Sequence, residues 1–138
     1  MPTNEFQVEV DTQYLPMQSD PEQGVYRFAY TITITNLGST AAQLVAREWH
    51  ILDAKGGEQQ VRGLGVVGRQ PLLQPGESHR YTSGCELPTP QGSMHGSYLC
   101  VNEEAEIFHT PIPLFVLDAQ DASDGSSPLA PPPSRVLH

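Results

Sequence analysis

The sequence has little cysteine and little positive charge, and both shortages limit what the protein does. Its two cysteines, Cys85 and Cys100, are too few for a disulfide framework and fit reduced thiols in a cytosolic protein. Seven Lys and Arg stand against 16 Asp and Glu, which gives a formal net charge of −9. Nucleic-acid phosphates and anionic membranes repel such a chain. We therefore expect no nucleic-acid and no membrane partner.

Long apolar runs are also missing. No stretch of about 18 apolar residues is present to cross a bilayer. The first residues, MPTNEFQVEV, lack the basic start and apolar segment of a secretory signal. We expect a cytoplasmic protein, and a chain of 138 residues is long enough to bury one core without metal or disulfide staples.

Helical periodicity is the third absence. Thirteen prolines and 12 glycines interrupt the chain so often that no apolar pattern of helical period reaches helix length. Two-residue alternation is present instead, most clearly in VYRFAYTITITN (residues 25–36), where aromatic and β-branched residues share one parity. The sequence predicts an all-β protein, an immunoglobulin-like or fibronectin type III-like antiparallel β-sandwich of about seven strands.

The expected strands are separated by turns rich in Gly, Pro, Asn and Asp. They cover residues 5–11, 25–36, 41–53, 58–68, 78–87, 93–102 and 107–117. A helix over 41–53 is the alternative to a strand that has a β-bulge near Ala46. Pro111 and Pro113 place the last strand on a sheet edge or at a bulge. Residues 1–118 form the predicted domain, and residues 119–138, rich in Ser, Asp and Pro, a flexible tail.

A glycine motif stands in VRGLGVVGRQPLL (residues 61–73). Gly63, Gly65 and Gly68 have the G-x-G-x-x-G spacing that holds a dinucleotide's pyrophosphate in other proteins. That turn needs a following helix, which the prolines after Gly68 exclude. The motif is therefore interpreted first as strand and loop.

Anion binding without a helix is the alternative for this motif. Two arginines flank the glycines, and Arg80 follows on a later strand. Guanidinium groups and oriented backbone N–H groups can hold phosphate without a helix. The candidate pyrophosphate or nucleotide site consists of Arg62, Gly63, Gly65, Gly68 and Arg69.

Metal binding and catalysis lack a recognisable motif. The histidines are scattered, and no C-x-x-C, H-x-H or H-E-x-x-H spacing occurs. They are His50, His79, His95, His109 and His138. A site with Cys85 and Cys100 across neighbouring strands is the alternative, but we predict no metal site and no cofactor. Ser83, Cys85 and His95 can be imagined as a nucleophile and base without a nucleophile elbow, so we predict no enzyme.

A protein-binding surface is the remaining class of site. The segment SGCELPTPQGSMHGSY (residues 83–98) contains Leu87, two prolines and Met94, residue types that suit a recognition loop. Packing of these residues in the core is the alternative. Edge strands offer a second route, by strand addition with a peptide or with another copy of the chain.

Four stretches of the chain resemble the ApaG family. They are FAYTITITN, VRGLGVVGRQPLLQPGE, YTSGCELPTPQGSMHGSY and PIPLFVL, and the similarity runs from about residue 5 to residue 118. The resemblance implies one fibronectin type III or immunoglobulin-like domain, found alone in bacteria and appended to F-box and polymerase-interacting proteins in eukaryotes. It also implies a protein-recognition module, linked in bacteria with cobalt resistance and magnesium efflux, without agreed catalytic residues.

Overall fold

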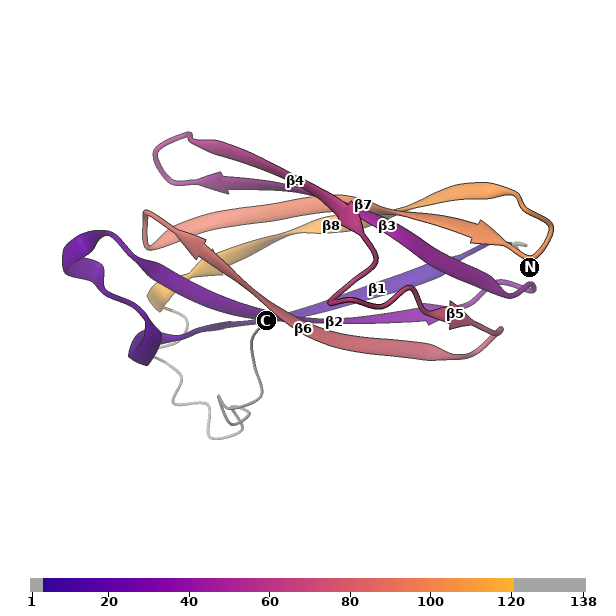
Figure 1. Cartoon of the computed structure of the whole chain (residues 1–138). Helices are drawn as coiled ribbons and strands as arrows, with labels where there is room; N and C mark the ends of the chain where they lie inside the picture. The colour runs from indigo at the N-terminus through magenta and orange to yellow at the C-terminus, as the bar shows by residue number, and fades with distance from the viewer. Residues whose placement is uncertain (1–3, 121–138) are drawn as a thin grey trace.

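Two antiparallel sheets stack face to face in the computed structural model, which describes residues 4–120 (Figure 1). The strands are β1 (Phe6–Tyr14), β2 (Tyr26–Asn36), β3 (Ala42–Asp53), β4 (Glu58–Leu64), β5 (Leu72–Leu73), β6 (Ser78–Leu87), β7 (Gln91–Asn102) and β8 (Ile107–Asp118). One sheet has the order β1-β2-β6, and the other β4-β3-β7-β8 with β5 paired to β3. The predicted all-β sandwich is confirmed, while the finer immunoglobulin-like or fibronectin type III-like description stays a prediction.

The alternation in β2 builds one wall of the core. Phe28, Ile32 and Ile34 are buried, whereas the threonines between them face outward. These outward hydroxyls pair across to β6, where the Thr31 and Thr82 oxygens lie 2.8 Å apart. The three-stranded sheet therefore has one apolar face and one polar face, as its two-residue period requires.

The five-stranded sheet supplies the opposite wall. Trp49 of β3 packs edge-on against Tyr30 of β2 at a ring-centroid distance of 5.4 Å, and against Phe115 of β8 at 5.9 Å. Tyr98 and Cys100 of β7 are fully buried beside them. Aromatic contacts between the two sheets thus hold the sandwich together.

Two irregularities appear at the places where the sequence predicts them. The pairing of β3 with β7 shifts between Leu44 and Ala46, which confirms the bulge near Ala46. The pairing of β7 with β8 shifts between Met94 and Gly96, opposite Pro113, and β8 is the last strand of its sheet. The prediction that the prolines of β8 lie on a sheet edge or at a bulge is therefore confirmed, since both are present.

The structure corrects one predicted segment and decides between the alternatives for another. The strand predicted over residues 58–68 ends at Leu64, because Gly65, Val67 and Gly68 have positive φ angles that no strand accommodates. In residues 83–98, the core alternative is confirmed for Leu87 and Met94, which are 2% and 1% exposed and so offer no recognition surface. Leu87 is the last residue of β6, and Met94 lies in β7. The predicted tail lies outside the described residues, apart from its first two positions.

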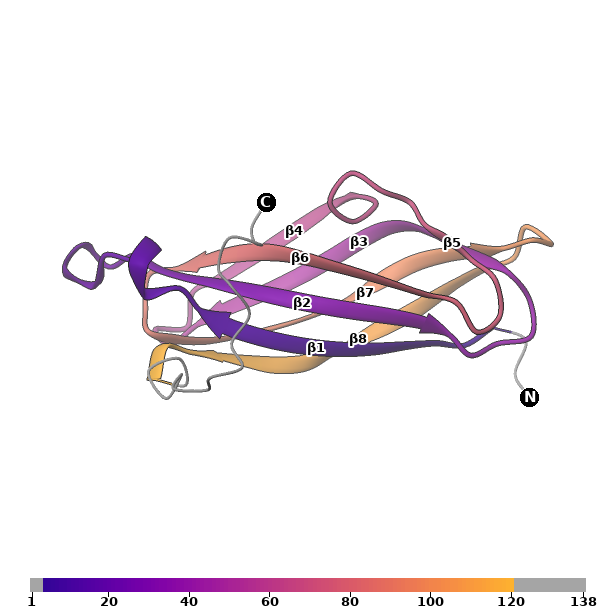
Figure 2. The same cartoon turned by 90° about the horizontal axis from the view of Figure 1, so that it is seen from below.

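The two sides of the sandwich differ. On one side, β1 packs against β8, and the Phe6 and Phe108 rings meet edge-on at 5.5 Å. On the other side, β6 faces a turn at residues 66–69, between β4 and β5 (Figure 2). We call these sides the closed seam and the open seam.

Candidate functional site

The turn at the open seam is a two-residue hairpin. The Val66 N–H donates to the Arg69 carbonyl at 2.7 Å, and the Arg69 N–H donates to the Val66 carbonyl at 3.0 Å. The two central residues, Val67 and Gly68, have φ angles of 47° and 77°. Both values are left-handed, as a type I′ turn requires, and glycine or asparagine adopts them more easily than a β-branched residue. Val67 is therefore a strained residue at the surface.

The bulge in β3 fixes this turn in place. The extra residue, Val45, directs its carbonyl toward the loop, where it accepts hydrogen bonds from the Gly65 N–H at 2.8 Å and from Gln70 Nε2 at 2.9 Å. Val66 then inserts into the core and is fully buried. The bulge and the glycines thus position the turn beside β6.

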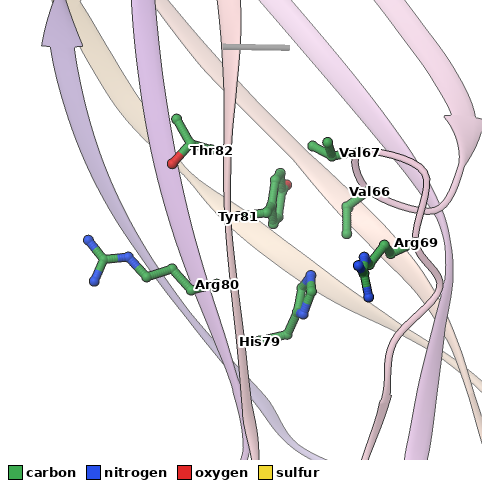
Figure 3. Close-up of a pocket in the computed structure, with 7 residues that line it drawn as sticks. All are labelled: Val66, Val67, Arg69, His79, Arg80, Tyr81 and Thr82. Atoms are coloured by element: carbon green, nitrogen blue, oxygen red, sulfur yellow. The ribbon is translucent and has the colours of Figure 1, made fainter. Parts of the chain in front are cut away.

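A groove of about 490 Å³ lies between this turn and β6 (Figure 3). Its lining residues are Val66, Val67, Arg69, His79, Arg80, Tyr81 and Thr82. We call it the seam groove. Four of the seven residues are consecutive in β6, so the groove runs along that strand.

In the described part of the chain, no acidic side chain lines the seam groove, and its basic side chains are Arg69, His79 and Arg80. Arg69 and His79 lie toward each other, while Arg80 points away on the other face of β6 (Figure 3). Burial, and secondarily the Arg69 charge, lower the pKa of His79. Within residues 4–120, neither Arg69 nor Arg80 forms an ion pair with a carboxylate. The groove is a positive site on an acidic protein.

The structure divides the anion site that the sequence nominates. Arg69 lines the seam groove, whereas Arg62 and Gly63 lie in β4 and line a different hollow. Arg62 Nε is 3.5 Å from Glu48 Oε1. Gly63 faces the Arg47 guanidinium, and a Cβ atom at Gly63 would stand 2.8 Å from its Nη1.

The backbone of the glycine loop is largely committed to the fold. The N–H groups of Gly65, Val66 and Arg69 all donate to carbonyl oxygens of the chain. A nest of free N–H groups is the usual backbone device for holding an anion. Because three of the five N–H groups in residues 65–69 are occupied, few backbone donors of this loop are left to hold an anion.

The second hollow, of about 580 Å³, lies on the outer face of the five-stranded sheet. It is lined by Ala46, Arg47, Glu48, Arg62, Gly63, Leu64, Ser97, Leu99 and His109. Glu48 is its acidic centre and accepts hydrogen bonds from Gln60 at 3.0 Å and His50 at 2.9 Å. The Gln60 bond, together with the Arg62 and His50 groups, lowers the pKa of Glu48. The charge of this hollow is thus compensated locally.

Apolar residues extend from this hollow across neighbouring strands. Ala46 pairs with Leu64 on one side and with Leu99 on the other, and Val101 pairs with Ile107. Leu64, Leu72 and Ile107 are 73%, 58% and 67% exposed. We call the group formed by Ala46, Leu64, Leu72, Leu99, Val101 and Ile107 the outer apolar patch.

Sequence reasoning missed the outer apolar patch because its members come from five strands. The signal was present in β8, where Ile107 occupies the outward parity. Such a residue is ordinary when it stands alone. Only the strand pairing shows that several of them lie together.

The histidines and cysteines do not form a reactive cluster in residues 4–120. No group of three or more His, Cys, Asp or Glu in this range could hold a metal ion. His50 and His95 stack at 4.9 Å on the outer face, and His138 lies outside the described residues. Cys85 is in β6 and His95 in the other sheet. Burial raises the pKa of Cys85 to about 11, so its thiol stays protonated at neutral pH.

The fold and these surfaces define a class: a small antiparallel β-sandwich domain with a cationic groove at one seam and an apolar patch on one outer face. Residues 16–102 match the family model described as the ApaG domain, and the chain belongs to the ApaG family. Across residues 4–120, the structure has no helix that is long and apolar enough to cross a membrane.

Several relatives cover most of this chain. Protein ApaG of Acidovorax sp. (strain JS42) is 59% identical over 140 residues, with 100% of each chain covered. Protein ApaG of Ralstonia nicotianae is 56% identical and covers 82% of this chain and 91% of its own. A crystal structure of a Bordetella pertussis protein named ApaA is 53% identical, covers 85% of this chain and 95% of its own, and has a TM-score of 0.83.

Proposed function

We propose that this protein is a non-enzymatic, cytoplasmic protein-binding module, that it takes part in cobalt resistance and magnesium efflux in bacteria, and that it does so through a protein partner. The outer apolar patch carries this proposal. Several exposed apolar residues on neighbouring strands of one face mark an interaction site more often than single scattered ones do.

The surroundings of the patch support this proposal. The face has a polar rim, because Glu48, Arg62 and Ser97 line the adjoining hollow. An apolar centre with a polar rim is the usual anatomy of a protein interface. A second copy of the chain, added at an edge strand, is the homo-oligomeric form of the same proposal.

Capture from a native lysate tests this function with matched variants. Leu64→Glu and Ile107→Glu place a charge in the outer apolar patch, whereas Met17→Glu places one at an apolar residue that is 94% exposed elsewhere. We expect one reproducible partner that is retained by the parent protein and by Met17→Glu and lost by the two patch variants. Equal retention by all four proteins would contradict the proposal.

The seam groove favours a second candidate function, which is binding of pyrophosphate or a nucleotide. The candidate residues are Arg62, the loop from Gly63 to Gly68, and Arg69. The Arg69 side chain lines the groove and forms no ion pair with a carboxylate of residues 4–120. Calorimetry with pyrophosphate tests it. Loss of heat in both Arg62→Ala and Arg69→Ala supports the whole site, loss in Arg69→Ala alone limits the site to the seam groove, and no heat at millimolar ligand ends the idea.

A further inference from the structure

We propose that the seam groove takes an extended, acidic peptide segment of a partner protein, which adds to the free edge of β6 as a further strand. The inference rests on the proposed protein-binding function and names a second surface and the chemistry of its partner. Strand addition uses backbone hydrogen bonds for affinity and flanking side chains for selectivity.

Half of the β6 backbone faces away from its own sheet. The Asn36 N–H donates to the Glu77 carbonyl at 2.9 Å, and the antiparallel register continues without a shift through β6. In such a ladder, hydrogen-bonded and non-hydrogen-bonded pairs alternate. The odd-numbered residues of β6 therefore bond to β2, while Arg80 and Thr82 direct their N–H and carbonyl groups to the free edge.

Side-chain spacing gives the same assignment independently. The hydroxyl oxygens of Thr31 and Thr82 lie 2.8 Å apart, and so do those of Thr35 and Ser78. Side chains approach more closely in non-hydrogen-bonded pairs than in hydrogen-bonded pairs. Thr82 and Ser78 thus occupy the positions whose backbone groups point outward.

Nothing in residues 4–120 pairs with this edge. β6 is the last strand of its sheet, and the turn opposite it satisfies its own hydrogen bonds through Val66 and Arg69. The groove follows residues 79–82, which span about 13 Å in an extended strand. A short peptide segment in the same conformation would lie along the groove with its backbone facing Arg80 and Thr82.

The side chains around the edge select acidic residues. A bound strand directs alternate side chains to its two faces. One face would meet Arg69 and His79, and the other would meet Arg80. No Asp or Glu of residues 4–120 lines the groove, although the chain as a whole has a net charge of −9. Val67 and the Tyr81 ring add apolar surface, so we expect carboxylates interspersed with apolar residues.

The other edges suit this partner less well. β8 contains Pro111 and Pro113, which interrupt a ladder. β1 packs against β8 at the closed seam. β4 has one cationic residue, Arg62, and Glu48 lies beside it.

The test uses a ten-residue peptide in which Glu alternates with Val or Thr, and a control peptide with Lys in place of Glu. Backbone amide hydrogen exchange is followed residue by residue in the full chain. We expect the acidic peptide to slow exchange at Arg80 and Thr82 by about tenfold or more, because an edge amide that gains a hydrogen bond becomes protected. The Lys peptide should change neither amide.

A matched pair of variants separates backbone pairing from charge. Arg80→Ala removes the guanidinium and keeps the edge N–H, whereas Arg80→Pro removes both without breaking the β2 ladder. We expect Arg80→Ala to weaken peptide binding about tenfold and Arg80→Pro to weaken it at least tenfold further. Circular dichroism checks that Arg80→Pro folds. If this variant does not fold, hydrogen exchange in the parent protein still tests the inference.

Four results would overturn the inference, and the last of them leaves the protein-binding function intact. The first is binding of the acidic peptide without protection of Arg80 and Thr82, which would indicate an anion site formed by side chains alone. The second is equal affinity of folded Arg80→Ala and Arg80→Pro. The third is a dimer in solution whose β6 edge is already protected without peptide. If a lysate partner is lost with Leu64→Glu but retained by Arg80→Pro, the protein-binding function stands and the strand-addition site falls.

Discussion

The two seams of the sandwich close the same core in opposite ways. At the closed seam, aromatic rings from β1 and β8 meet directly, and Asn102 Nδ2 donates to Asn4 Oδ1 at 3.1 Å. At the open seam, one buried valine and a strained turn stand opposite β6, with a cationic groove between them. One seam contributes packing, and the other leaves backbone and charge available. We therefore expect the closed seam to contribute more to stability, and we place the proposed strand addition at the open seam.

The largest difference between the seams should appear in core truncation. We expect Phe6→Ala to reduce the free energy of unfolding by about 3 kcal/mol, because it removes a buried ring and its edge contact with Phe108. Urea unfolding measures the loss. Arg69→Ala at the open seam is the control, with an expected change within about 0.5 kcal/mol. Equal losses would remove the distinction between the seams.

A buried tyrosine pair should stabilise the open seam, because it connects β6 to β7 across the core. The hydroxyls of Tyr81 in β6 and Tyr98 in β7 lie 2.5 Å apart, and burial raises the pKa of both. We expect Tyr81→Phe and Tyr98→Phe each to cost about 1–2 kcal/mol, since each leaves one hydroxyl unpaired. The double variant should cost less than the sum. An additive double variant would show that the hydroxyls do not interact.

The strain in the open-seam turn gives a smaller effect of opposite sign. Val67 has a φ of 47°, which Asn tolerates better. We expect Val67→Asn to stabilise the protein by about 1 kcal/mol in thermal unfolding. The matched control is Val116→Asn, an exposed position in β8 where no such strain exists. A loss of stability at Val67 would mean that this side chain contributes contacts that outweigh its strain.

The smallest expected effect is the pH response of the open seam. Burial and the Arg69 charge lower the pKa of folded His79 below the ordinary value of 6.5. The unfolded chain therefore takes up this proton first, and stability falls as the pH drops below 6.5. Because His79 is partly solvated, we expect a loss under about 0.5 kcal/mol between pH 7 and 5. His79→Gln should remove that component from urea titrations, and an unchanged pH profile would contradict it.

Local alternation made most of this fold predictable. The parity of residues 25–36, the bulge near Ala46 and the two prolines of β8 are signals that can be read from neighbouring residues alone. The extent of β4 was not predictable in the same way. Residues 65–68 are apolar enough for a strand. They leave the β4 strand because Gly65 donates its N–H to the Val45 carbonyl and because the φ angles of Gly65, Val67 and Gly68 are positive.

The candidate site was predictable only in part. Arg69 and Arg80 were nominated from the sequence, and both line the seam groove. His79 was not assigned to it, because only the fold shows that this side chain, and not Arg80, lies toward Arg69 (Figure 3). Arg62 and Arg69 looked equivalent as flanking cations. Their difference follows from hairpin pairing, which sets Arg62 opposite Glu48.

Native-state hydrogen exchange along β6 in the protein alone tests the free edge most directly. We expect alternation, with slow exchange at His79 and Tyr81, whose N–H groups bond to β2, and fast exchange at Arg80 and Thr82 on the free edge. Uniform protection of all four amides would mean that the open seam is covered. In that case it could not serve as a recognition surface.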